Sequence, residues 1–228
     1  MTDFPDHGLL LALQHADSQF PSGGFAFSQG LEAASQLAER LGGFDFPGFL
    51  AAQVRHRWAE ADRVALVRAH RAHGDLAALS ALDAEVEAST FMEGLRSGSK
   101  RNGTALLTTH ARIGTPGAPA YRAMVRAGEA HGHLAVVQGL LWRALDLDEA
   151  TAVAMSGYQA VASLATAAIR LGLIGAIEAQ RLIGEAMPLV RASGAIPVAD
   201  DEPIRSFVPM AEVAVALHGA SGQRLFSN

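Results

Sequence analysis

The chain has 228 residues, half of them hydrophobic but only 6% aromatic, with a formal net charge of −5 and no cysteine. A chain of this length can bury a substantial core in one domain, and a core of alanine, leucine, valine and isoleucine favours packed helices over a β-sandwich. The acidic balance disfavours nucleic-acid binding, and the lack of cysteine excludes disulfides, thiolate nucleophiles, zinc ribbons and iron–sulfur clusters.

Helical periodicity, capping residues and helix breakers predict an all-α, single-domain bundle of roughly eight to ten helices spanning residues 1–228. Glycine-rich residues 94–103 are expected to form a break or kink between two helices. Pro188 is expected to limit another helix, and residues 191–208 are expected to cross the surface as a loop. The expected helices cover about 8–16, 28–41, 47–72, 75–95, a stretch ending near 113, 120–145, 149–171, 176–187 and 209–218.

Two stretches bear on where the protein resides. Residues 1–8 contain Asp3 and Asp6 but no lysine or arginine, so they lack the positive region of a secretory signal, and we expect a cytoplasmic protein. Residues 151–169 carry no charge over a length that matches a bilayer. Their many alanine, serine, threonine and glycine residues insert poorly, so we expect a buried central helix and no membrane span. Such small residues let neighbouring helices approach closely.

The most irregular stretch is residues 17–32, which read DSQFPSGGFAFSQGLE. Asp17 and Ser18 suit a turn closed by a side chain on the backbone, Pro21 fixes its own φ, and Ser28 suits the N-cap of the next helix. No strand precedes this stretch and no Gly-Lys-Ser/Thr ending follows, so a phosphate-binding loop is disfavoured. Its serines lack a histidine or acid at nucleophile spacing. The stretch therefore sets how two helices meet or presents a surface to a partner.

Two histidine pairs are candidate metal ligands. His70 and His73 are three residues apart on one expected helix, so a divalent ion could bridge them, but no carboxylate accompanies them at a fixed spacing. A solvated, arginine-rich helix end is the favoured interpretation of this pair. His131 and His133 are two residues apart, which directs them to different faces unless the helix breaks there.

Two basic segments are candidate contact sites. Lys100 and Arg101 could hold an anion, although a solvated turn is favoured in an acidic chain. Near the end of the chain, Arg224, Leu225 and Phe226 follow glycines in a segment too short to bury itself easily. Arginine and aromatic residues are common interface anchors, and a frayed terminus packed on the core is the equal alternative.

Several separate motifs then point to one family. Residues 17–32 place an Asp-Ser pair, a Pro-x-Gly turn, the aromatic Phe25 and the segment Ser-x-Gly-Leu-Glu in this order. This arrangement closely resembles the N-terminal signature of the UreF family of urease accessory proteins. Further matches follow along the whole chain at residues 101–103 with 106–107, 132–133 with 137–139, 167–172, 178–180, and 218 with 224–226.

The resemblance implies an all-α scaffold that is not an enzyme. Members of the family join a UreD/UreH accessory protein and the nickel-carrying GTPase UreG in a complex that delivers nickel to apo-urease, and they are proposed to modulate the GTPase and to help form a nickel passage. It also implies that the N-terminal segment 1–27 and the C-terminal tail 219–228 contact partners. The implied partner-binding residues are Phe25, Ser28, Gly30, Leu31, Glu32, Arg224, Leu225 and Phe226.

The resemblance also implies how the chain handles metal. Without cysteine it is not expected to hold a cofactor or store nickel tightly, and any nickel ligand would be an oxygen or imidazole group such as Glu32. Alanine-rich helices and an apolar surface loop are compatible with a homodimer. The alternative functions are a metal-dependent enzyme or GTPase-activating protein that uses His70, His73 or Arg101 supplied as an arginine finger, and an all-α interaction module unrelated to nickel.

Overall fold

The computed structural model describes residues 7–22 and 29–218, which contain helices and no strand. The π-helix η2 joins α3 and α4 without a break, so these three elements form one rod and the described residues contain ten separate helices. This confirms the predicted all-α bundle. The elements are α1 (His7–Ala16), α2 (Leu31–Arg40), α3 (Phe46–Gln53), η2 (Val54–Asp62), α4 (Arg63–Arg71), α5 (Leu76–Ser89), α6 (Glu93–Ile113), α7 (Ala118–Ala127), α8 (Leu134–Ala144), α9 (Glu149–Arg170), α10 (Ala176–Gly194) and α11 (Pro209–His218).

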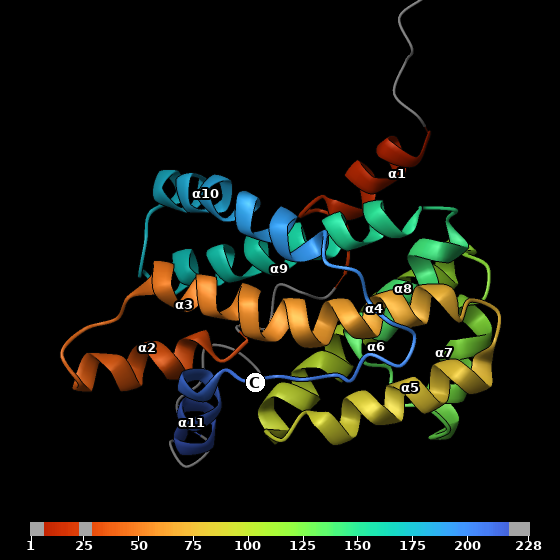
Figure 1. The fold of residues 1–228 in the computed structure, drawn as a ribbon, viewed down its shortest axis with the longest axis horizontal. Coiled ribbons are helices and arrows are strands. Elements are labelled where there is room, and N and C mark those ends of the chain that lie inside the picture. Colours follow the sequence, from red (N-terminus) through yellow and green to blue (C-terminus); the bar gives the residue numbers. More distant parts are fainter. Residues whose placement is uncertain (1–6, 23–28, 219–228) are drawn as a thin grey trace, which may run out of the picture.

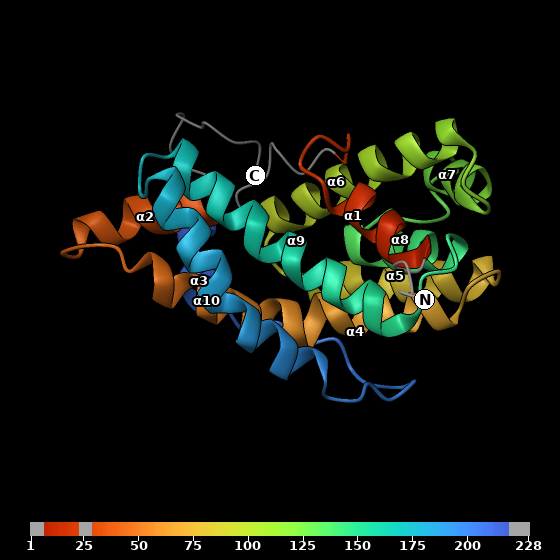
Figure 2. The same ribbon diagram turned by 90° about the horizontal axis from the view of Figure 1, so that it is seen from above.

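The rod of α3, η2 and α4 runs through the middle of the molecule (Figure 1). Helix α8 packs against α4, and α9 packs against α10, α4 and η2. Helix α6 packs against α7 and α8, whereas α2 and α11 pack together at one end of the molecule. Viewed from above, α9 and α10 lie along one side of the bundle and α6 and α7 lie toward the other (Figure 2).

Glycines allow the central helices to cross closely. A Cβ atom on Gly139 of α8 would lie 2.4 Å from the carbonyl oxygen of Leu66 in α4, and one on Gly157 of α9 would lie 2.4 Å from Val190 Cγ1 in α10. Both distances are far below van der Waals contact, so only glycine permits these crossings. The expectation that small residues in α9 let its neighbours approach is confirmed.

The π-helix leaves carbonyl groups that a distant loop uses. The amide of Arg205 donates to the Glu60 carbonyl at 3.1 Å, and the amide of Phe207 donates to the His56 carbonyl at 3.2 Å. A π-helix bonds each amide to the carbonyl five residues earlier, which disrupts the regular helical pairing. Residues 195–208 therefore lie along the rod, as the predicted surface loop should.

Three arginines of the rod hold the same loop by its backbone carbonyls. Arg63 Nη1 donates to Ile196 at 2.5 Å, Arg68 Nη1 to Glu202 at 3.1 Å, and Arg71 Nη1 to Val198 at 2.8 Å. Charged donors make stronger hydrogen bonds than neutral ones. The loop is thus fixed along its length although its own sequence forms no regular structure.

Several predicted boundaries are wrong. Residues 94–103 do not interrupt a helix but lie inside α6, and the helix expected over 120–145 is broken between α7 and α8. Helix α10 continues past Pro188, because Val190 and Ser193 are buried against the core and this packing outweighs the local preference of proline. Helix α2 begins at residue 31 after a left-handed Gly30, and Ser28, its expected N-cap, lies outside the described residues.

The predicted central helix is α9. Asp148 caps it by accepting a hydrogen bond from the Thr151 amide at 2.7 Å. Of the described helices it is the one long and apolar enough to cross a bilayer, but 56% of its apolar window is buried inside the fold. This burial is typical of the core helix of a globular domain.

Substitution of Gly103 tests the close packing of α6 against the loop before α8. A Cβ atom there would lie 2.1 Å from the Gly132 carbonyl oxygen, so we expect Gly103→Ala to lower the free energy of unfolding by ~1–3 kcal/mol. Gly184, an exposed helical glycine of α10 with no atom near its Cβ position, is the matched control. Gly184→Ala should raise the same free energy by ~0.5–1 kcal/mol in urea unfolding. Equal effects of the two substitutions would contradict this packing.

Candidate partner-binding site

The turn after α1 is built by hydrogen bonds of its own residues. Asp17 Oδ1 accepts from the Gln19 amide at 2.7 Å, and the Asp17 carbonyl accepts from the Phe20 amide at 3.0 Å. Thr109 of α6 then donates to the Pro21 carbonyl at 2.8 Å. The predicted side-chain turn at Asp17 is confirmed, and it fixes residues 17–21 on α6.

Residues 29 and 30 lie where α2, α9 and α11 meet. Gln29 Nε2 donates to Ser163 Oγ of α9 at 2.9 Å. Gly30 has a φ of 81°, and a Cβ atom on it would lie 3.2 Å from Val215 Cγ2 and 3.3 Å from Ala211 Cβ of α11. Glycine is favoured here both because of its left-handed backbone and because α11 lies so close.

The predicted site residues fall into two groups. Gly30, Leu31 and Glu32 lie together at this junction and are buried within the chain, with Glu32 only 1% exposed. Leu31 belongs to the single hydrophobic core. The other residues of the predicted site lie outside the described residues, namely Phe25, Ser28, Arg224, Leu225 and Phe226.

Two helices near the ends of the chain expose apolar faces. In α1, Ala12 and His15 are buried, whereas Leu9, Leu10 and Leu13 are 49%, 46% and 61% exposed. In α11, exposed Met210, Val213 and Leu217 recur at helical spacing. Clustered apolar side chains at a surface are typical of protein contacts, and the sequence analysis did not single out these residues.

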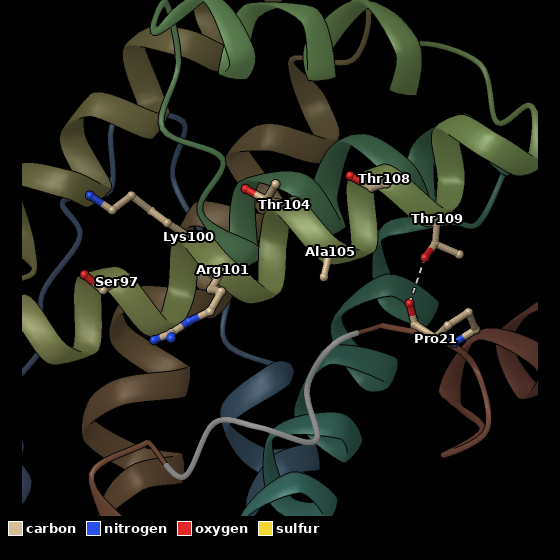
Figure 3. A pocket seen from close by; sticks show the side chains of 8 residues that line it. All are labelled: Pro21, Ser97, Lys100, Arg101, Thr104, Ala105, Thr108 and Thr109. Carbon is tan, nitrogen blue, oxygen red and sulfur yellow. Dashed lines mark hydrogen bonds between the residues drawn. The ribbon is translucent and has the colours of Figure 1, made fainter. Parts of the chain in front are cut away.

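A shallow groove runs along α6 beside the turn at Pro21 (Figure 3). It has a volume of about 1000 Å³, and most of its lining is one face of α6. Lys100 Nζ is bound to Glu87 at 3.0 Å and is therefore not an unpaired cation. The residues that line the groove are Pro21, Ser97, Lys100, Arg101, Thr104, Ala105, Thr108 and Thr109.

A buried carboxylate holds the break between α7 and α8. Asp83 of α5 accepts from Tyr121 Oη at 2.9 Å and from the backbone amides of His131, Gly132 and His133 at 2.7, 2.6 and 3.0 Å. These amides cannot also bond along a helix, which is why the predicted long helix is interrupted here. Sequence reasoning missed Asp83 because its partners lie 38 to 50 residues away.

His133 connects Ser99 to Glu87. Its Nδ1 is 3.1 Å from Ser99 Oγ and its Nε2 is 2.8 Å from Glu87 Oε2. Although burial opposes ionisation, hydrogen bonds from Lys100 and His133 hold the pKa of Glu87 below its ordinary value. Burial lowers the pKa of His133 despite the charges of Asp83 and Glu87, so a neutral imidazole donates to Glu87 and accepts from Ser99.

The order serine, histidine and carboxylate resembles a hydrolase relay, but its exposure is reversed. Ser99 is only 8% exposed and its oxygen also accepts from the Leu134 amide at 3.3 Å, whereas the carboxylate end reaches the surface. A nucleophile must face its substrate. The arrangement therefore fits a structural connection between α5, α6 and α8.

Neither candidate histidine pair forms a metal site with further ligands in the described residues. His70 is buried and its Nε2 donates to the Leu147 carbonyl at 2.8 Å, so its predicted position at a solvated helix end is wrong, whereas His73 is exposed. The helix does break at His131 and His133, yet His133 is committed to Ser99 and Glu87. Within residues 7–22 and 29–218, no three histidine, aspartate or glutamate side chains gather to hold a metal ion.

These features define a class of protein: an all-α chain with one core and with exposed apolar helix faces near both of its ends. The model of the UreF family matches residues 44–187. The chain therefore belongs to the UreF family of urease accessory proteins.

Similar proteins extend this match over almost the whole chain. The urease accessory protein UreF of Trichodesmium erythraeum is 29% identical over 96% of both chains. UreF 1 of Brucella melitensis biotype 1 is 33% identical over 97% of this chain and 93% of its own. UreF of Kocuria rhizophila is 34% identical over 96% of both. The N-terminal turn and α11, which lie outside the family-model match, are thus covered by these relatives.

Asp83 tests the role of the buried network. Asp83→Ala leaves three backbone amides, two of them buried, and one buried hydroxyl without their acceptor, so we expect the free energy of unfolding to fall by ~3–5 kcal/mol. Tyr121→Phe removes one of these donors and should cost ~1 kcal/mol. The exposed Asp201→Ala is the control and should stay within about 0.5 kcal/mol of the parent protein in urea unfolding. A loss at Asp83 no larger than that at Asp201 would contradict this role.

Proposed function

We propose that this protein is a non-catalytic adaptor of urease maturation that joins a UreD/UreH-type accessory protein to a UreG-type GTPase while nickel is delivered to apo-urease. The observation that carries the proposal is the packing of residue 30, which directly follows the N-terminal segment, against α11, which directly precedes the C-terminal tail. Gly30 packs against Ala211 and Val215 of α11. A partner that contacts one segment is therefore well placed to contact the other.

The exposed faces of α1 and α11 support binding as the mode of action. Leu9, Leu10 and Leu13 expose apolar surface in the free chain, whose burial against a partner contributes about 25 cal/mol per Å². Met210 and Val213 do the same on α11. Exposed leucine and valine side chains of this kind are removed from water when a partner covers them, which favours a permanent or recurrent complex.

Nickel in this proposal is cargo of the complex. The chain has no cysteine, and the carboxylate of Glu32 is buried at the junction of α2, α9 and α11. Thiolate ligands are therefore missing from the whole chain, which leaves imidazole and oxygen groups as ligands for nickel. We propose that any contact with the ion is transient and uses oxygen or imidazole ligands.

A second candidate function is activation of the GTPase. Arg101 is an exposed residue of α6 that lines the groove beside Pro21 (Figure 3). An arginine finger has to be exposed in this way to reach the nucleotide site of a partner GTPase. Hydrolysis of GTP by the partner GTPase, measured with and without this protein, separates the candidates. An activator raises turnover by orders of magnitude and loses this effect in Arg101→Ala, whereas an adaptor leaves turnover within a few-fold.

The leucine face of α1 gives a direct test of the adaptor. We expect Leu9→Ser combined with Leu13→Ser to weaken capture of the UreD/UreH-type protein about tenfold or more, because two exposed anchors lose their apolar surface. Ile177→Ser, which changes an 86% exposed residue of α10, is the matched control and should bind as the parent protein does. Co-purification of tagged variants measures the capture. Equal capture by all three proteins would contradict the use of α1.

A further inference from the structure

Four aromatic rings attach the N-terminal part of the chain to the body of the bundle. His15 of α1 and Phe20 of the following turn face His110 of α6 and Trp142 of α8. The ring centroids of His15 and His110 are 5.1 Å apart and the two ring planes are stacked at 23°. The ring centroids of His15 and Phe20 are 4.7 Å apart. Trp142 lies 5.5 Å from His15 and 5.7 Å from His110. We call these four residues the ring cluster.

Three rings of the cluster are buried and Phe20 is partly buried, and within the described part of the chain three polar ring atoms have no partner. His15 Nδ1 donates to the Leu11 carbonyl at 2.8 Å, and His110 Nδ1 is 2.9 Å from Thr115 Oγ1. The Nε2 atoms of both histidines and Nε1 of Trp142 are buried and have no hydrogen-bond partner. Because a carbonyl can only accept, His15 carries its proton on Nδ1 and its Nε2 is an unpaired acceptor.

Among the described residues, no carboxylate is paired with either histidine of the ring cluster, so a proton there would have no compensating negative charge. The neighbouring side chain from α9 is the neutral Gln159, which donates to the His15 carbonyl at 2.9 Å, and α8 contributes the uncharged Trp142. Asp17, two residues after His15 in the sequence, is exposed and accepts a hydrogen bond from the Gln19 amide. The ionisable group that faces His110 is His15 itself, and two protonated rings at this distance would repel each other.

Helix α1 has few other attachments. Of its residues only Ala12 and His15 are buried and Leu11 is partly buried against the core, while Leu9, Leu10 and Leu13 are exposed. The hydrogen bonds from Gln159 to the His15 carbonyl and from Thr109 to the Pro21 carbonyl lie at the edges of the same contact. The docking of α1 and the turn therefore depends on the ring cluster together with the apolar contacts of Leu11 and Ala12.

We propose that the ring cluster is a proton-sensitive latch, in which protonation of His15 and His110 releases α1 and residues 17–22 from α6 and α8 while the rest of the bundle stays folded. Release would change how the leucine face of α1 is presented. The latch goes beyond the adaptor function and does not depend on the identity of any partner.

The direction of the pH dependence follows from the two histidines. Burial lowers the pKa of His110 to about 4, with a further lowering by His15, and burial lowers the pKa of His15 against the effect of its bond to Leu11. Once α1 is released, His15 and the uncovered His110 bind protons nearer the ordinary value of about 6.5. Docking is therefore strongest above pH 6.5 and weakens as the pH falls toward 4, by about tenfold at one unit below 6.5 from His110 alone, and further from His15.

Amide hydrogen exchange of the full chain, followed by mass spectrometry from pH 7.5 to 5, tests the latch. After correction for intrinsic exchange rates, we expect the opening constant of peptides covering residues 7–22 to rise at least tenfold between pH 7 and 5.5, while peptides of α9 change little. His15→Phe combined with His110→Phe should abolish this rise. His7→Asn, which changes an exposed histidine of the same helix, should retain it.

Three results would overturn the latch. The opening constant of residues 7–22 could be independent of pH, it could rise together with that of α9, or its rise could persist in the double phenylalanine variant. NMR titration of the parent protein keeps the test decisive if that variant fails to fold. Imidazole pKa values of His15 and His110 at or above 6.5 would then contradict the latch, and values clearly below 6.5 would support it.

Discussion

The close crossing of helix backbones is the constraint on which the rest of the structure depends. Gly139 lets α8 lie against the backbone of α4, and Gly157 lets α9 lie against α10 and the indole of Trp58. Trp58 in turn donates to Ser156 Oγ at 3.1 Å, which fixes the π-helix on α9. A core with few aromatic rings gains its contact area from this proximity, because dispersion forces decline steeply with distance.

Polar groups connect this core to the surfaces at which we propose that partners bind. Asp83 fixes the segment before α8, and α8 carries Trp142, against which His15 of α1 packs. The arginines of the rod hold residues 195–208, which lead into α11. Both ends of the chain are thus positioned by interactions made in the middle of the fold.

Local chemistry made much of the fold predictable. The caps at Asp75 and Asp148, the turn at Asp17 and the burial of α9 follow from residues within a few positions of one another. The break before α8 could not be predicted because it depends on a carboxylate 48 residues earlier. The glycines of α6 suggested a helix break, but Gly103 instead makes room for residues 132–133, which are distant in the sequence. Of the candidate site, the convergence of residue 30 with α11 was likewise a tertiary property, whereas the family was evident from spaced motifs.

The central claim is that a helical adaptor, without chemistry of its own, is required for urease to acquire its metal. The most direct measurement is nickel-dependent urease activation in a system containing apo-urease, the UreD/UreH-type protein and the UreG-type GTPase, with and without this chain. We predict that urease stays largely inactive at limiting nickel when this chain is omitted. Adding the chain should restore activity, and the chain itself should not be consumed. Full activation at the same nickel concentration in the absence of the chain would contradict the account.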